Sequence, residues 1–167
     1  MNKFGGVGTG SAERVHVRKA EAADSAAISG CLEAAFALYR ERYTPEAYAD
    51  TVPDAQGVLG RMREMNLFVA VSDGTIVGTL GSMVNGSEGH LRGMAVRPEW
   101  QGTGVASGLL AVVETELQKS GCNSITLDTT EPLESATRFY ENHGYSRSAR
   151  AADFFGMPLY EYRKLLL

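Results

Sequence analysis

The segment between residues 97 and 108 constrains the fold of this chain more than any other feature. Small residues occupy alternate positions in it (Gly102, Gly104 and Ala106), where an amphipathic helix is predicted to begin, over Gly104–Lys119. Small side chains let backbone N–H groups turn toward a ligand, and the positive end of the helix dipole points at the same place. The segment therefore predicts an anion site, most often for a phosphate or pyrophosphate group. The alternative is a glycine-rich helix entry that binds nothing.

The length of 167 residues favours one domain. The chain has 19 glycines, where average usage would give about 12. Four of them lie in residues 1–12, which we expect to form a flexible lead-in to a domain over residues 13–167. Of the others, six lie in the predicted hairpin and the strand that follows it (Gly74, Gly78, Gly81, Gly86, Gly89 and Gly93), and Gly102, Gly104 and Gly108 form or follow the loop of the anion site.

Charge and residue usage exclude several classes of protein. With 16 basic and 20 acidic residues the net charge is −4, whereas a nucleic-acid partner would require a basic face. The two cysteines and three histidines are scattered, so we expect neither a disulfide scaffold nor a metal site. No apolar run is long enough for a membrane span, and the first residues lack the apolar core of a signal peptide. These patterns indicate a cytoplasmic protein that contacts neither membrane nor nucleic acid.

Hydrophobic periodicity predicts the order of helices and strands. Strands are predicted at residues 15–18, 67–72, 75–84, 90–96, 124–129 and 158–165. Helices are predicted from residue 24 or 25 to residue 39, and over residues 55–64, 104–119 and 132–143. Residues 43–56 are expected to be loop or broken helix, and Asp73-Gly74 a two-residue hairpin turn. The order, with one further strand near the C-terminus, predicts an α/β (α+β) single domain. We expect a mixed sheet of about six or seven strands with helices on both faces.

Two common phosphate-binding motifs fit the glycine loop less well. Gly102, Gly104 and Gly108 loosely follow the GxGxxG pattern of dinucleotide folds, but the strand does not run directly into the glycines and the βαβ unit is not repeated. No Gly-Lys-Ser/Thr follows, so the loop is not a P-loop.

The loop and a second motif resemble those of the GNAT superfamily of acetyl-coenzyme-A-dependent N-acetyltransferases. Gln101–Ala106 matches that family's Gln/Arg-x-x-Gly-x-Gly/Ala pattern. Phe139–Tyr145 looks like the family's Phe/Leu-Tyr-x-x-x-Gly-Phe/Tyr segment. The resemblance is strong over residues 67–145 and weaker on either side.

The resemblance implies acetyl-CoA as co-substrate and no metal. Backbone groups of Met94, Ala95 and Val96 would bind the pantetheine arm as if it were an extra strand. The pyrophosphate would be held by backbone N–H groups of Gln101, Gly102, Thr103, Gly104, Val105, Ala106 and Ser107. The thioester would lie where strands 90–96 and 124–129 splay apart, and Gly93 suits a bulge there. Many members carry Asn where this chain has Leu133, so Glu131 or Thr130 are the candidates for that polar contact.

The same resemblance suggests catalytic groups. Tyr140 is the candidate general acid for the departing thiolate, since it shares a helical face with Ala136, Phe139 and His143 that would bury its ring. His90 is a candidate general base, on the strand face that alternation assigns to residues 90, 92, 94 and 96. Glu88 and a chain of water molecules are the other candidates for the base.

The expected acceptor is a primary amine of a small molecule or peptide, attacked directly in a ternary complex. Tyr39, Tyr43 and Phe154, with acidic residues such as Asp50, suit a cationic amine. The family resemblance is compatible with a homodimer. The alternative hypothesis is a non-catalytic acyl-CoA-binding or sensing module of the same fold.

Overall fold

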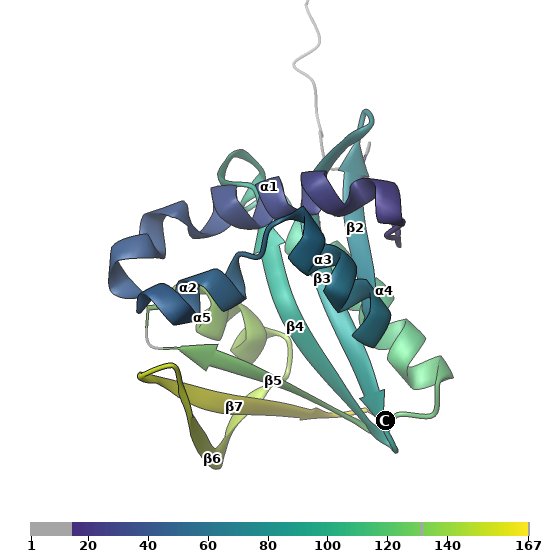
Figure 1. Cartoon of the computed structure of the whole chain (residues 1–167). Helices are drawn as coiled ribbons and strands as arrows, with labels where there is room; N and C mark the ends of the chain where they lie inside the picture. The colour runs from purple at the N-terminus through teal and green to yellow at the C-terminus, as the bar shows by residue number, and fades with distance from the viewer. Residues whose placement is uncertain (1–14, 131, 167) are drawn as a thin grey trace, which may run out of the picture.

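The computed structural model describes residues 15–130 and 132–166, in which seven strands form one sheet (Figure 1). The sheet order is β1-β2-β3-β4-β5-β7-β6, and only β4 and β5 pair in parallel. The strands are β1 (Val15–Lys19), β2 (Asn66–Ser72), β3 (Thr75–Asn85), β4 (Glu88–Val96), β5 (Ser124–Thr130), β6 (Ser146–Phe154) and β7 (Met157–Leu165). The predicted lead-in, residues 1–12, lies outside the described residues.

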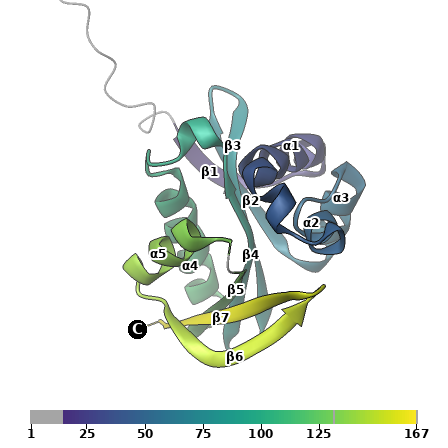
Figure 2. The same cartoon turned by 90° about the vertical axis from the view of Figure 1, so that its left-hand side faces the viewer.

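Helices cover both faces of the sheet, which confirms the predicted fold class (Figure 2). One face carries α1 (Ser25–Phe36), α2 (Pro45–Thr51) and α3 (Ala55–Glu64), and the other carries α4 (Val105–Lys119) and α5 (Glu134–Asn142). None of these helices is long and apolar enough to span a bilayer.

Local sequence patterns predicted α3 and α4 well. The apolar positions expected on one face of α4 are the five buried residues of that helix, Val105, Leu109, Leu110, Val113 and Leu117. The turn between β2 and β3 is the expected pair Asp73 and Gly74, with φ angles of 47° and 76°. Both positive values match a type I′ turn, whose twist suits a hairpin.

Other boundaries differ from the prediction. Residues 43–56 contain the helix α2, which starts because Thr44 caps it and Pro45 fits its first turn. The helix predicted over residues 132–143 starts only at Glu134, because Leu133 at its N-cap leaves the helical conformation, so Pro132 precedes the helix. The α-helix α1 ends at Phe36 and continues as a 3₁₀ turn over Ala37–Arg42.

The sheet separates two hydrophobic cores. Leu80, Leu109 and Ile125 belong to the core beneath α4 and α5, and Leu32 and Val69 to the core beneath α1–α3. The interior strand β3 is buried over most of its length because helices cover both faces of the sheet. Gly78 lies in this strand against α4. A Cβ atom there would lie 2.8 Å from Val105 Cγ1, 3.0 Å from Leu109 Cδ1 and 3.3 Å from the Ala95 carbonyl oxygen.

We therefore expect Gly78→Ala to lower the free energy of unfolding by about 1–3 kcal/mol, because it overpacks the contact between β3 and α4. Gly60→Ala is the matched control. It lies in the interior of α3 with no atom within 4 Å of the added Cβ, and should raise stability by about 0.5–1 kcal/mol. Urea denaturation measures both. Equal effects of the two variants would contradict the packing described for Gly78.

Candidate active site

The parallel pairing of β4 and β5 ends early. Residues Glu88–Leu91 pair with Ser124–Leu127, and beyond these four pairs the two strands diverge. The strand β5 continues in pairing with β7 through Thr130, whereas β4 remains attached only to β3. The edge of β4 that faces β5 therefore has no strand partner from Arg92 onward.

A β-bulge at Gly93 accompanies this divergence. Arg92 pairs with Gly81 and Ala95 with Thr79, so two residues of β4 oppose one of β3, and Gly93 takes a φ of +72°. An extra residue reverses which face each following side chain occupies. Arg92 lies on the α1–α3 side, where it contacts Asp50, whereas Met94 packs against the core beneath α4 and α5. The bulge that Gly93 was expected to suit is thus present.

The prediction that residues 90, 92, 94 and 96 share one face is therefore wrong. His90 and Arg92 face α1–α3, and Met94 and Val96 belong with the opposite core. Alternation holds only in a regular strand, and the bulge interrupts it between these two pairs.

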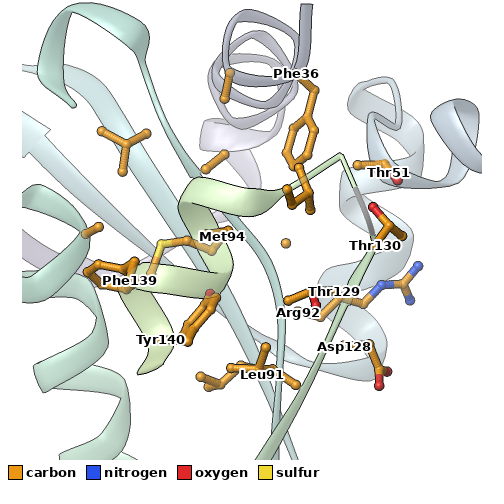
Figure 3. A pocket seen from close by; sticks show the side chains of 18 of the residues that line it. Phe36, Thr51, Leu91, Arg92, Met94, Asp128, Thr129, Thr130, Phe139 and Tyr140 are labelled. Atoms are coloured by element: carbon orange, nitrogen blue, oxygen red, sulfur yellow. The ribbon is translucent and has the colours of Figure 1, made fainter. Parts of the chain in front are cut away.

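A cavity of about 790 Å³ passes through the divergence and has lining residues on both faces of the sheet (Figure 3). Met94, Phe139 and Tyr140 lie on one side of the view, and Arg92 and Asp128 on the other. We call the part lined by the glycine loop and α5 the loop half, and the part lined by α1–α3 and by Phe154 of β6 and Leu159 of β7 the α1–α3 half.

The loop half ends at the start of α4. Gly104 is the N-cap of α4 with a φ of +91°, and Gly102 has a φ of +76°. No atom lies within 4 Å of a Cβ built on either glycine, so both positions face open space. Left-handed conformations of this kind turn successive backbone N–H groups toward one concave surface, where an anion can bind.

Tyr140 is buried between the loop half and the core. Its ring packs edge-on against Phe139 and Tyr145, with centroids 5.2 and 5.5 Å apart. The hydroxyl forms no hydrogen bond with another residue of the described ranges, and the side chain lines the cavity. The predicted burial of the ring is confirmed, and the cavity reaches the side chain. Burial raises the pKa of the Tyr140 hydroxyl, which favours its protonated form.

His90 pairs with Thr126 in the third of the four pairs between β4 and β5, one position before the strands diverge. Its Nδ1 is 2.8 Å from Thr126 Oγ1, and its Nε2 is 3.5 Å from Asp128 Oδ2. The Thr126 hydroxyl donates to Glu88 Oε1 at 3.4 Å, so it accepts from Nδ1–H of His90. The Nε2 lone pair is then free, next to the Asp128 carboxyl. Burial raises the pKa of Asp128, and His90 opposes that rise.

The α1–α3 half combines aromatic and charged side chains. The Tyr43 hydroxyl is 3.1 Å from Thr130 Oγ1, and burial raises its pKa while this hydrogen bond opposes the rise. Arg92 Nη2 donates to Asp50 Oδ2 at 2.7 Å, and the Arg61 guanidinium donates to the Asp50 carbonyl oxygen. Burial lowers the pKa of Arg61 to about 10, with the like charge of Arg92 adding to this effect and Asp50 opposing it.

Comparison with known proteins identifies the family. Residues 31–145 match the sequence model of the Acetyltransferase (GNAT) family, which is more than half of the chain. The chain belongs to the GNAT acetyltransferase family. It is therefore an acetyl-CoA-dependent N-acetyltransferase by family, as its two motifs suggested.

Relatives of this GNAT protein agree in sequence and in fold. The aminoglycoside N(6')-acetyltransferase type 1 of Stenotrophomonas maltophilia is 29% identical over 153 residues, which cover 86% of this chain and 93% of that protein. PaiA N-acetyltransferase of Thermoplasma acidophilum in complex with coenzyme A has a TM-score of 0.79 at 15% identity, over 91% of this chain and 99% of that one. YncA of Salmonella typhimurium with its cofactor acetyl-CoA has a TM-score of 0.71 at 18% identity, over 92% and 95%. The two structures show the shared fold.

The GNAT fold brings most of the predicted site residues to the one cavity. Those that line it are Tyr39, Tyr43, His90, Met94, Ala95, Val96, Gln101, Gly102, Gly104, Ala106, Ser107, Tyr140 and Phe154. Thr103 and Val105 do not line it, because the Thr103 hydroxyl donates to the Trp100 carbonyl and Val105 is buried in the core. Glu88 also lies outside it, since its carboxylate is held 2.5 Å from Arg163 Nη2.

Leu133 lines the cavity as an apolar side chain, at the position where many GNAT members carry asparagine. Of the two groups suggested to replace that asparagine, the Thr130 hydroxyl is already 3.1 Å from the Tyr43 hydroxyl. Glu131 lies outside the described residues.

Sequence reasoning missed three charged residues of the GNAT cavity, namely Arg61, Arg92 and Asp128. A local signal existed for Asp128, which lies two positions after Thr126 on a predicted strand. Alternation puts the two side chains on the same face, and Thr126 is the residue that pairs with His90. Arg61 and Arg92 carry no such local pattern, because their shared partner Asp50 comes from a helix that was expected to be loop or broken helix.

We expect Gly93→Ala to reduce acetyl transfer about 10- to 100-fold, because a side chain at positive φ distorts the bulge that spaces the two strands. Gly86→Ala is the matched control, since Gly86 has a φ of +62° in the turn between β3 and β4, away from the cavity. Both variants should lose about 1–2 kcal/mol of stability. If turnover falls equally in the two, measured as thiol release beside urea denaturation, the bulge has no special role.

Proposed function

We propose that this GNAT protein transfers the acetyl group of acetyl-CoA to a primary amine of a small molecule or peptide, by direct attack in a ternary complex. The observation that carries the proposal is one cavity with three features in order. The glycine loop lies at one end, the Tyr140 side chain lies near the divergence of β4 and β5, and the pair His90–Asp128 lies on the opposite face.

The loop half has the features that a coenzyme A molecule requires. The open positions at Gly102 and Gly104, ahead of the 15-residue helix α4, provide backbone N–H groups and a helix dipole for the pyrophosphate. The unpaired edge of β4 at Met94–Val96 offers backbone groups for the pantetheine amides. When bound, acetyl-CoA supplies an acyl group on a good leaving thiol. The Gln101 side chain donates to the Val96 carbonyl at 3.1 Å and so connects the glycine loop to the end of β4.

Tyr140 is the proposed general acid. Its hydroxyl stays protonated at neutral pH, because burial disfavours the phenolate, and it lines the cavity without a described hydrogen-bond partner. It can therefore give its proton to the departing thiolate of coenzyme A. A thiol has a pKa near 8.5, so this help lowers the barrier but is not indispensable.

His90 is the proposed general base, and Asp128 its positioning residue. An amine with a pKa near 10.4 costs about 4.6 kcal/mol to deprotonate at pH 7. Deprotonation of the amine is therefore a larger barrier than departure of the thiol. The free Nε2 of His90 can accept that proton, and Asp128 at 3.5 Å then stabilises the imidazolium. Glu88 orients the ring through the Thr126 hydroxyl, which makes it a second positioning residue.

A non-catalytic acyl-CoA-binding module is the second candidate function. The Tyr140 hydroxyl has no hydrogen-bond partner among the described residues and lines the cavity, which favours the enzyme, since a binding module has no need of a proton donor there. Incubation with acetyl-CoA and a panel of amines separates the two. Release of free thiol that depends on the amine supports transfer, whereas coenzyme A binding without thiol release across the panel supports the module.

Tyr140→Phe should lower kcat roughly 10- to 1,000-fold without loss of stability, since it removes a proton donor but no described hydrogen bond. Tyr145→Phe is the matched control. That hydroxyl donates to Glu114 Oε1 at 3.0 Å, so the variant should lose about 1.5–3 kcal/mol of stability and keep its kcat. An unchanged kcat in folded Tyr140→Phe, measured by thiol release, would remove Tyr140 from the mechanism.

His90→Gln should lower kcat/KM about 100-fold at neutral pH and abolish the acidic limb of the pH–rate profile, because that limb reports protonation of the base. Asp128→Asn should move the same limb to lower pH, since the imidazolium loses its carboxylate partner. His16→Gln, at an exposed position of β1, is the control and should leave the profile unchanged. An acidic limb that persists in His90→Gln would point to Glu88 or a water chain instead.

A further inference from the structure

Two guanidinium groups converge on one aspartate in the α1–α3 half. Arg92 of β4 donates to the carboxylate of Asp50, and Arg61 of α3 donates to the backbone carbonyl of the same residue. A guanidinium has five N–H donors. Within the described ranges each arginine uses one of them in a hydrogen bond to Asp50, and both side chains line the cavity. Donors therefore remain for a ligand.

The charge around these arginines is incompletely balanced. The acidic side chains among the described lining residues are Asp50 and Asp128, and Asp128 is beside His90. Asp50 alone thus faces both Arg61 and Arg92, with its carboxylate bound to Arg92. Burial and the neighbouring Arg92 already lower the pKa of Arg61 to about 10. A partly buried cation in this setting gains most from a further anion.

Arg61 also lies close to the place of reaction. Its Nη1 is 3.4 Å from the point where a Cβ on Gly93 would sit. Gly93 is the bulge at which β4 leaves β5, and the acetyl group is proposed to lie in that opening. An anionic group bound by Arg61 is consequently only a few atoms from the attacking amine.

We propose that the acceptor is a free amino acid, whose carboxylate is bound by Arg61 and Arg92 while its α-amine attacks the thioester. This inference rests on the proposed function and names its substrate class. The aromatic residues Tyr39, Tyr43 and Phe154 line the remainder of the α1–α3 half and would contact the amino-acid side chain. A polycationic aminoglycoside would instead meet two guanidinium groups.

The proposed step balances. The amine nitrogen forms a bond to the acetyl carbon, and the carbon–sulfur bond breaks. The ammonium form of the amino acid starts with three protons on nitrogen, and the amide product keeps one. One proton leaves to water through His90. Tyr140 gives its own proton to the departing sulfur. The second proton from nitrogen replaces it, so Tyr140 ends the reaction protonated.

The test compares matched acceptors in the thiol-release assay. The probes are the proteinogenic amino acids, their α-amides, and an aminoglycoside with a free 6′-amine. Amides keep the amine and the side chain but lack the carboxylate. We expect kcat/KM to be at least about tenfold higher for the best amino acid than for its amide.

Variants then assign the preference to the arginines. Arg61→Gln should raise KM for the amino acid about 10- to 100-fold, and kcat/KM should fall much more for the amino acid than for its amide, so that the preference for the carboxylate is lost. Arg61→Lys should recover part of the loss. Arg63→Gln is the matched control, an exposed position on the same helix outside the cavity, and should behave as wild type.

Each failure has its own outcome. If the amides or the aminoglycoside are turned over as fast as the amino acids, the carboxylate subsite is overturned and acetyl transfer is not affected. A fall in kcat alone in Arg61→Gln, with equal loss on acids and amides, would assign Arg61 to the reaction centre and also overturn the subsite. Absence of thiol release with every probe, in protein that binds coenzyme A by calorimetry, would overturn the proposed function and this inference with it.

Discussion

The early end of the parallel pairing between β4 and β5 is the constraint on which the rest of the site depends. Backbone groups in a sheet need partners, and a strand that leaves its neighbour in mid-sheet leaves a row of them unmatched. Here the bulge at Gly93 turns β4 aside after Leu91, while β5 continues with β7. The resulting gap is both a passage through the sheet and an edge with free hydrogen-bonding groups. Tyr140, His90 and the two arginines line one cavity because this gap lies between them.

The sequence was informative wherever the structure depends on adjacent residues. The five buried residues of α4, the turn at Asp73 and Gly74, and the open glycines at 102 and 104 all follow from spacing within a few positions. The loop half of the cavity is largely built from one continuous stretch, residues 94–107, with α5 packed beside it. For this reason most residues predicted for this half line it, whereas the side chains of Thr103 and Val105 make local and core contacts, and the backbone roles expected of these residues stay predictions.

The α1–α3 half was much less predictable, for two physical reasons. One inserted residue at Gly93 reverses the faces of β4, so the alternation that put His90 together with Met94 fails although each residue was correctly placed on a strand. The second reason is distance along the chain. Asp50 and Arg92 are 42 positions apart and meet only because α2 and β4 pack together, and no periodic pattern encodes such a pair. Charged residues on a short helix look like ordinary solvated surface until the tertiary structure is known.

The two halves of the cavity come from separate parts of the chain. The described lining residues of one half come from residues 35–61, 83 and 154–159, those of the other from residues 94–107 and 133–140, and residues 90–93 and 127–130 lie between the two halves where the strands diverge. A hydrogen bond from Thr44 Oγ1 to the Phe155 carbonyl, 2.7 Å long, joins the two distant contributions to the first half. The residues proposed to meet the acceptor are thus separate in sequence from those proposed to bind coenzyme A. Substitutions in the first set can change which amine fits the cavity without altering the loop that is proposed to hold the acetyl donor.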